Sequence, residues 1–165
     1  MRRSNPEDTG SRRNRRADDL SELDKRIIEH LQQDGRRAFT QIASALGVSE
    51  AAVRARTNRL IERGILQVVG VADPGKLGFQ QALIGIRCEP GHLLEVADAL
   101  AALGEVDYVV VTAGRFDILI EAVAEDNEGL LRFLAERLQR IEGVRDTETF
   151  TYLRLVKQTY QYGTR

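Results

Sequence analysis

Long hydrogen-bond donors are concentrated in the segment 50–63, which has the periodicity of an amphipathic helix. At 100° per residue from Val53, one side of this helix is apolar and is predicted to face inward. It consists of Val53, Thr57, Leu60 and Ile61. The opposite side is small or polar, with two arginines on its flanks, and consists of Ala51, Ala55, Asn58, Arg59 and Glu62, flanked by Arg54 and Arg56. Arginine and asparagine can donate to base edges and phosphates, and alanine lets a helix approach base edges closely. The segment therefore predicts a DNA-recognition surface; the alternative is a solvated basic helix face.

The residues before this segment predict a second, shorter helix and a tight turn. Thr40 is a suitable N-cap, Gly47 can take a positive φ after the short helix, and Ser49 can cap the next one. Two short helices joined in this way form a helix-turn-helix, which places its second helix in a major groove. The residues predicted to contact DNA are Thr40, Gln41, Ser49, Ala51, Arg54, Arg56, Asn58 and Arg59.

A turn in the second half of the chain could bind a small zwitterion. Gly114 lies between two predicted strands and lets backbone N–H groups approach a carboxylate, while Asp117 could hold an ammonium group. The alternative for this turn is a plain β-turn with a polar tip. Thr147, Thr149 and Thr151 lie on one side of the last predicted strand, where threonine commonly just favours β structure.

The sequence gives little support for metal binding, catalysis or a phosphate-binding loop. Cys88 and His92 are too few to form a closed zinc site. The chain shows no nucleophile with a convincing base, no Gly-rich phosphate loop and no metal-binding carboxylate cluster. We therefore expect no catalytic residues, no metal and no cofactor.

The elements that position these residues fall into two groups. Ser21 begins a first helix with Asp24 at the capping-box position, and the helix-turn-helix follows. The apolar, β-branched segment 65–71 predicts a small wing or a connecting strand, and Asp73-Pro74-Gly75 indicates a domain boundary. The remaining elements alternate as β-α-β-β-α-β, with strands at 81–88, 106–112, 117–124 and 144–156 and helices at 92–103 and 127–141.

This order predicts an α+β protein, with an N-terminal helix-turn-helix domain, followed by a small wing or a connecting strand, and then a ferredoxin-like domain with an antiparallel sheet. The predicted divisions are a disordered basic arm at 1–18, a DNA-binding domain at 19–72, a hinge at 73–80, an effector and oligomerisation domain at 81–156 and a tail at 157–165. Because both helices of the second domain cover one sheet face, a second copy of the chain is expected to bury the other.

Composition agrees with a soluble protein that contacts phosphate through one half only. Residues 1–72 carry 14 Lys/Arg against 10 Asp/Glu, and residues 73–165 carry 10 against 15, which together give the net charge of −1. No apolar run approaches the roughly 20 residues of a membrane span. A single cysteine and no secretory signal favour a cytoplasmic, nucleoid-associated protein. The arginine-rich arm either reaches DNA or is a solvated tail.

Two sets of motifs carry a resemblance to a known family. The first set is Leu23-Asp24-x-x-Ile27-Ile28, Asp34-Gly35-Arg36, Ile42-Ala43-x-x-Leu46-Gly47-Val48-Ser49 and Val53-x-x-Arg56-x-x-Arg59-Leu60-x-x-x-Gly64-Ile65. The second set is Thr112-x-Gly114-x-x-Asp117-x-Leu119, Gly143-Val144 and Thr147-x-Thr149. Together they resemble the leucine-responsive/asparagine-regulator (Lrp/AsnC) family of transcription factors over about residues 20–156. Thr57 departs from the resemblance, since the family usually has Ile or Val there.

The resemblance implies a winged helix-turn-helix DNA-binding domain, a hinge, and a ferredoxin-like effector and oligomerisation domain. It implies dimers that often assemble into tetramers, octamers or larger rings. It also implies that an amino acid binds between subunits near Thr112, Gly114, Asp117, Thr147 and Thr149. The hypothesis is therefore a sequence-specific DNA-binding regulator whose oligomeric state or DNA-domain spacing responds to an amino acid or related metabolite. Two alternatives remain: an effector-independent DNA-organising protein, and an enzyme or metabolite-binding module on the ferredoxin-like half.

Overall fold

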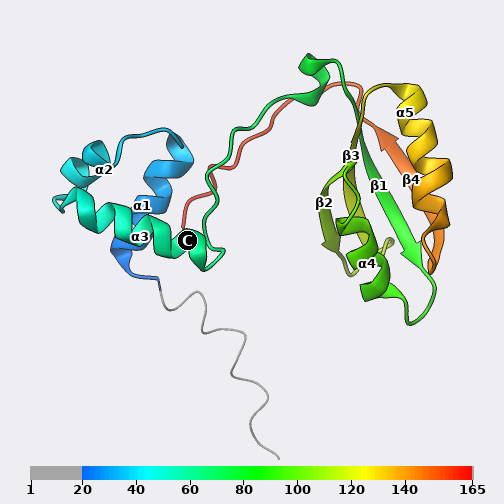
Figure 1. Ribbon diagram of the computed structural model, residues 1–165, viewed down its shortest axis with the longest axis horizontal. Helices are drawn as coiled ribbons and strands as arrows, with labels where there is room; N and C mark the ends of the chain where they lie inside the picture. Colours follow the sequence, from blue (N-terminus) through cyan, green and yellow to red (C-terminus); the bar gives the residue numbers. More distant parts are fainter. Residues whose placement is uncertain (1–19, 165) are drawn as a thin grey trace, which may run out of the picture. The chain divides into compact units, whose positions relative to one another are not determined.

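The computed structural model describes residues 20–164, which form two compact units (Figure 1). The first unit comprises residues 20–70 together with 159–164, and the second is Val71–Gln158. The basic arm predicted at 1–18 lies outside the described residues. Because the last residues belong to the first unit, the chain passes between the two units twice.

The first unit is built from α1 (Glu22–Gln33), α2 (Phe39–Leu46) and α3 (Glu50–Glu62). The capping box predicted at Ser21 and Asp24 is present at the start of α1. Gly47 ends α2 with φ +67°, a conformation that glycine adopts without a Cβ penalty. The side chain of Ser49 then accepts from the Ala52 N–H and caps α3, as predicted. These features confirm the helix-turn-helix.

One apolar core holds the three helices together. Its fully buried side chains are Ile27 of α1, Ile42 of α2, and Val53 and Leu60 of α3. Each lies at helical spacing on the inward stripe of its helix, so burial of these stripes against one another fixes the crossing of the helices.

Three local predictions in this unit are wrong. Thr40 does not cap α2, because the cap position is taken by Ala38, which provides no side-chain hydrogen bond. Ile61 is not inward but 45% exposed, since it lies 80° around α3 from Val53, at the edge of the apolar stripe. The segment 65–71 forms no wing: no β-strand lies among residues 20–79, and only Leu66 of this segment is buried.

The second unit follows the predicted β-α-β-β-α-β order. A 3₁₀ turn (η1, Pro74–Leu77) leads into β1 (Gln80–Cys88), α4 (Leu93–Ala101), β2 (Val106–Val111) and β3 (Ile118–Ala124). The second helical segment is α5 (Asn127–Arg132), continued by one π turn (η2, Phe133–Arg137) and one 3₁₀ turn (η3, Leu138–Arg140). The last strand is β4 (Val144–Thr151). The strands lie in the order β2-β3-β1-β4 and every pair is antiparallel, which confirms the ferredoxin-like sheet.

Both helical segments cover the same face of this sheet. Alternate residues of β1, among them Ile84 and Ile86, are fully buried and pack with Val96 and Leu100 of α4 and with Leu138. Every second side chain of a strand points to the same face of the sheet, and side chains three or four residues apart share one face of a helix. Burial of these matching faces against each other produces the one-sided core.

The other face of the sheet is open in the described chain. Tyr108 and Phe150 are about half exposed there, and the Tyr152 hydroxyl donates to Glu121 Oε1 at 2.8 Å. Burial, and next the hydrogen bond to Glu121, raise the pKa of Tyr152 to about 12.

The C-terminal segment neither extends β4 to residue 156 nor remains outside the fold. The strand ends at Thr151, which pairs with Ala82 near the start of β1. Further along, the Gly163 N–H donates to Gln32 Oε1 at 3.0 Å and the Thr164 hydroxyl donates to Glu29 Oε1 at 2.6 Å. Gly163 and Thr164 are therefore docked on α1.

Candidate DNA-binding and effector sites

The helix α3 presents a narrow outward face made of small and polar side chains. Val53, Thr57 and Leu60 are buried beneath it. Ala51, Ala55 and Asn58 are exposed and, at spacings of four and three residues, lie in one row along the helix. Arg54 is exposed beside this row. The arrangement allows close approach of the helix backbone, with donors along its length.

The Arg54 side chain makes an exposed ion pair and a cation–π contact within its own unit. Its guanidinium lies 2.6 Å from Glu50 Oε1 and 5.2 Å from the centre of the Phe39 ring. Both charged side chains of the pair are well exposed, so the pair contributes little to stability. Arg54 can therefore exchange Glu50 for another anion at small cost.

Arg56 and Arg59 share a carboxylate that comes from α1. Arg56 Nη1 lies 2.9 Å from Asp24 Oδ1, and Arg59 Nη2 lies 3.5 Å from the same oxygen. Burial by itself raises the pKa of Asp24, but hydrogen bonds from Ser21 and Arg56 outweigh it, and the pKa is lowered. Arg56 and Arg59, both predicted to contact DNA, are thus held by the buried Asp24. From the sequence, Asp24 was predicted only to cap α1.

The other predicted DNA contacts lie at the starts of α2 and α3. Thr40, Gln41 and Ser49 are all exposed. The hydroxyl oxygen of Ser49 already accepts a hydrogen bond from the Ala52 N–H at 3.2 Å, which leaves its O–H free to donate. Exposed hydroxyl and amide groups of this kind can donate hydrogen bonds to phosphate oxygens.

The predicted effector turn is a well-ordered connection between β2 and β3. The Thr112 hydroxyl donates to the Phe116 carbonyl at 2.5 Å, and the Thr112 N–H donates to the Asp117 carbonyl at 2.8 Å. Asp117 Oδ2 accepts from the Cys88 N–H at 2.8 Å. One carboxylate oxygen of Asp117 therefore ties the turn to the end of β1. Burial, and next the Asp117 charge, raise the pKa of the Cys88 thiol.

Phe116 anchors the same turn on the open face of the sheet. A Cβ placed on Gly85 would lie 2.6 Å from the Phe116 ring, so only glycine leaves room for it. The ring also meets Phe150 edge-on at 6.5 Å between centroids, and the neighbouring Arg115 pairs with Glu148 at 3.0 Å. Sequence reasoning missed this contact, although a glycine in a strand interior, here Gly85, is a signal of close approach.

The two predicted threonines lie apart from the turn. Thr147 is paired with Ile86 and Thr149 with Ile84, so both share the helix-covered face with these isoleucines. Asp117 lies at the same end of the sheet as Thr147, on the other side of β1. The structure thus brings Thr112, Gly114 and Asp117 together in one turn, with the threonines two strands away.

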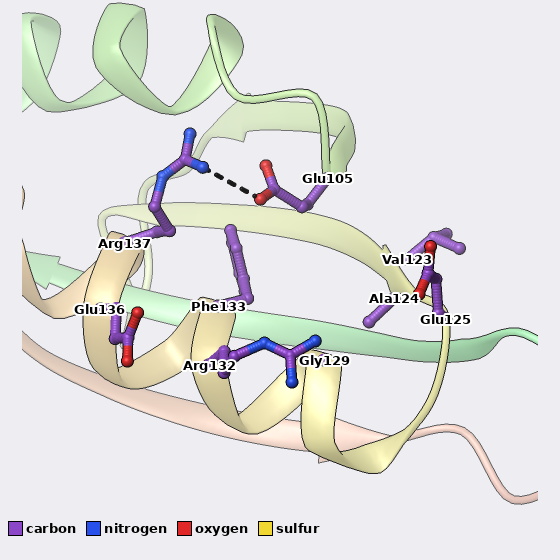
Figure 2. Close-up of a pocket in the computed structure, with 9 residues that line it drawn as sticks. All are labelled: Glu105, Val123, Ala124, Glu125, Gly129, Arg132, Phe133, Glu136 and Arg137. Atoms are coloured by element: carbon purple, nitrogen blue, oxygen red, sulfur yellow. Dashed lines mark hydrogen bonds and ion pairs between the residues drawn. The ribbon is translucent and has the colours of Figure 1, made fainter.

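A separate open pocket of about 380 Å³ lies beside α5 (Figure 2). Figure 2 shows Arg137 reaching from the α5–η2 helical segment toward Glu105, whose Oε1 lies 3.3 Å from Arg137 Nη1. Its lining combines cations, carboxylates and one aromatic ring, and consists of Glu105, Val123, Ala124, Glu125, Gly129, Arg132, Phe133, Glu136 and Arg137. No residue of the predicted effector set lines this pocket.

Residues 20–164 contain neither a metal-binding cluster nor a membrane-spanning helix. No group of three or more His, Cys, Asp or Glu side chains in this range could hold a metal ion. None of the helices described there is long and apolar enough to cross a membrane.

Comparison with known proteins decides the family. Residues 20–61 match the AsnC-type helix-turn-helix domain, and residues 81–162 match the Lrp/AsnC ligand binding domain. An uncharacterized HTH-type transcriptional regulator of Pyrococcus furiosus is 40% identical over 132 residues, which cover 79% of this chain and 89% of that protein. The chain belongs to the Lrp/AsnC family. The HTH-type transcriptional regulator LrpA of Pyrococcus horikoshii is 36% identical over 76% of this chain and 90% of its own length.

Solved structures agree with this membership. The AsnC protein of E. coli matches with a TM-score of 0.71 at 25% identity, over 86% of this chain and 98% of that chain. A Neisseria meningitidis regulator, solved as a complex with L-Met, matches with a TM-score of 0.73 at 23% identity, over 86% and 95% of the two chains. The latter likeness shows the fold alone. As an Lrp/AsnC protein, the chain is a transcriptional regulator with a DNA-binding helix-turn-helix domain and a ligand-binding domain, and it is not an enzyme.

Proposed function

We propose that this regulator reads DNA sequence by placing α3 in a major groove. The observation that carries the proposal is the outward row Ala51, Ala55 and Asn58, exposed opposite the buried Val53 and Leu60. Small side chains let the helix approach base pairs, and the amide of Asn58 has the geometry to bind adenine N6 and N7.

The other residues have different roles in this proposal. Arg54 and Arg59 reach guanine edges or phosphates. Thr40, Gln41 and Ser49 contact phosphates, and Ala51 permits close approach. Arg56 of α3, which is paired with Asp24 of α1, holds α3 in place and contributes positive charge near the DNA backbone.

The test is DNA binding by the Arg54→Ala/Arg59→Ala double variant. An operator is first selected from random-sequence DNA with the wild-type protein, and affinity is then measured by fluorescence anisotropy across a range of salt concentrations. We expect weaker binding and a shallower salt dependence, mainly from the loss of Arg54, because each full phosphate contact contributes about 0.9 to the slope of log K against log salt. The control is Arg140→Ala/Arg154→Ala, which removes the same two charges from exposed positions in the other unit. Unchanged affinity and slope in the double variant would rule out the assignment of α3.

We further propose that the ligand is an amino acid or related metabolite bound between subunits near the 112–117 turn. Backbone N–H groups around Gly114 suit a carboxylate, and the second oxygen of Asp117 suits an ammonium group. The ligand-binding family model supports the class of function, and a neighbour of the same fold is a complex with L-Met. Such a ligand acts only by its differential affinity for different oligomers or domain spacings.

Thermal-shift and calorimetric screens of the twenty amino acids test the ligand. A true ligand raises Tm with concentration. Thr149→Val is expected to weaken binding, while Thr151→Val is the matched control, since it lies on the same side of β4. Loss of binding in Arg132→Ala instead would place the ligand in the pocket beside α5. If none of the compounds binds while DNA binding is intact, the alternative of an effector-independent DNA-organising protein is favoured.

The proposed assembly is a homodimer, extending to a tetramer or octamer. The open face of the sheet, with Tyr108 and Phe150 about half exposed, supports burial by a second copy. Light scattering on Phe150→Asp tests it, because a buried charge at this position should shift the protein toward monomer. A wild-type mass equal to one chain would contradict the proposal.

A further inference from the structure

Carboxylates neutralise all three arginines of α3 that are predicted to meet DNA. Arg54 is paired with Glu50, whereas Arg56 and Arg59 both face Asp24. The two arrangements differ in kind. Glu50 lies on α3 itself with a 42% exposed side chain, while Asp24 belongs to α1 and its side chain is only 3% exposed. Asp24 is therefore a fixed anion directly beneath the recognition helix.

Its position is determined by several hydrogen bonds. Asp24 Oδ2 accepts from the Ser21 N–H at 3.1 Å and from the Ser21 hydroxyl at 2.7 Å. Arg56 Nη1 donates both to Asp24 Oδ1 at 2.9 Å and to Ser21 Oγ at 3.0 Å. A carboxylate held in this way cannot move away when DNA approaches.

The two arginines are held to different degrees. Arg56 has two acceptors and a 32% exposed side chain, so it is firmly bound. Arg59 lies 3.5 Å from the same oxygen and its side chain is 53% exposed, so its ion pair is looser. Arg59 is the arginine that a phosphate can remove from Asp24 more easily.

We propose that Asp24 is a specificity-determining residue, which competes with DNA phosphates for Arg56 and Arg59 and so suppresses non-specific binding. The inference rests on the proposed role of α3. Non-specific affinity comes almost entirely from arginine and lysine contacts to phosphate, so it is reduced most by an internal competitor. Sequence-specific binding also uses base contacts from Arg54 and Asn58, neither of which faces Asp24.

The test compares Asp24→Asn with Glu22→Gln. Both remove one negative charge from the first turn of α1, but the exposed Glu22 pairs with Lys25 and not with α3. Each protein is titrated against the selected operator and against the same duplex with scrambled sequence, over a range of salt concentrations. For Asp24→Asn we expect tighter binding to scrambled DNA and a slope steeper by about 1 for each released arginine per bound subunit. The operator-to-scrambled affinity ratio should fall several-fold.

A second substitution separates competition from a merely structural role. In the Asp24→Asn background, Arg59→Gln should remove most of the added slope, because the released arginine is gone. In the wild-type background, Arg59→Gln should change the slope by less than about half a unit, because Asp24 already competes for this arginine. This last measurement uses a protein with Asp24 intact, so a full-unit loss there overturns the inference even if Asp24→Asn does not fold.

The outcomes are distinct. A slope and a ratio for Asp24→Asn equal to those of Glu22→Gln would overturn the inference, as would a full-unit loss for Arg59→Gln alone. A wild-type protein that binds operator and scrambled DNA equally would instead overturn the proposed reading of DNA by α3.

Discussion

Asp24 Oδ1 lies 2.9 Å from Arg56 Nη1 and joins the first turn of α1 to the middle of α3. The pair connects the start of the folded domain to the helix proposed to read DNA. Its strength should therefore appear both in the stability of the domain and in DNA binding.

The stability provided by Asp24 should depend on pH. Its pKa lies below the usual 3.8 because hydrogen bonds from Ser21 and Arg56 outweigh the effect of burial. A carboxylate with a lowered pKa stabilises the fold above its unfolded pKa, and this stability is lost as pH falls through the folded pKa. Thermal melts followed by circular dichroism should show Asp24→Asn with a lower Tm than wild type at pH 7. That gap should narrow below about pH 4; a gap that stays constant would contradict the account.

Thr57→Val should stabilise the helix-turn-helix domain. The Thr57 side chain is 1% exposed, and within residues 20–164 its hydroxyl has no hydrogen-bond partner. Valine keeps the shape and removes the buried polar atom, so we expect a gain of about 1 kcal/mol in the free energy of unfolding. Urea denaturation measures it. A loss of stability would mean that the hydroxyl is satisfied in solution.

Gly85→Ala should destabilise the sheet domain, because its Cβ would collide with the Phe116 ring. Overpacking of this kind costs about 1 to 3 kcal/mol. Gly104→Ala is the matched control, since a Cβ there meets nothing within 4 Å. Adding Phe116→Ala to Gly85→Ala should recover part of the loss; no recovery would show that the collision is not the cause.

Tyr152 should titrate separately at high pH. Its pKa of about 12 means that the folded protein holds this proton more tightly than the unfolded chain. The corresponding stability is present below the unfolded pKa of about 10 and is lost as pH rises toward the folded value. Absorbance at 295 nm should lose its component near pH 12 in Tyr152→Phe and keep it in Tyr108→Phe. Persistence of that component in Tyr152→Phe would show that another group gives rise to it.

The sequence predicted those helices and strands whose periodic apolar side is buried against another element. The helix periods of α1 to α3 and the alternating strands of the second unit each had a partner to bury their apolar side. The β-α-β-β-α-β order then leaves few possible sheets, and the observed strand order is one of them.

The errors arise where local preference has no tertiary partner. Residues 65–71 are β-branched, but a strand needs a neighbouring backbone, and none pairs with them in the described chain. Likewise β4 stops at Thr151 because β1 begins at Gln80, and the Tyr152 N–H makes its bond to the Gln81 carbonyl.

The candidate sites were predictable to different degrees. Asn58 and Arg54 could be placed on the outer side of α3 from spacing alone. The hydrogen bond from Arg56 to Asp24 joins residues 32 positions apart and depends on how α1 and α3 cross. The capping pattern at Ser21 and Asp24 does not predict that crossing. The same limit applies to Phe116 over Gly85, because a glycine in a strand can indicate a close approach but does not identify its partner.

The most direct test of the account is the binding of Asn58→Ala to a set of operators, each carrying a single base-pair change. For the wild-type protein, each unfavourable change should cost about 1 to 3 kcal/mol. The account predicts that Asn58→Ala loses discrimination at one position in each half-site and keeps it elsewhere. Uniform weakening at every position, with discrimination unchanged, would contradict sequence reading by the outward face of α3.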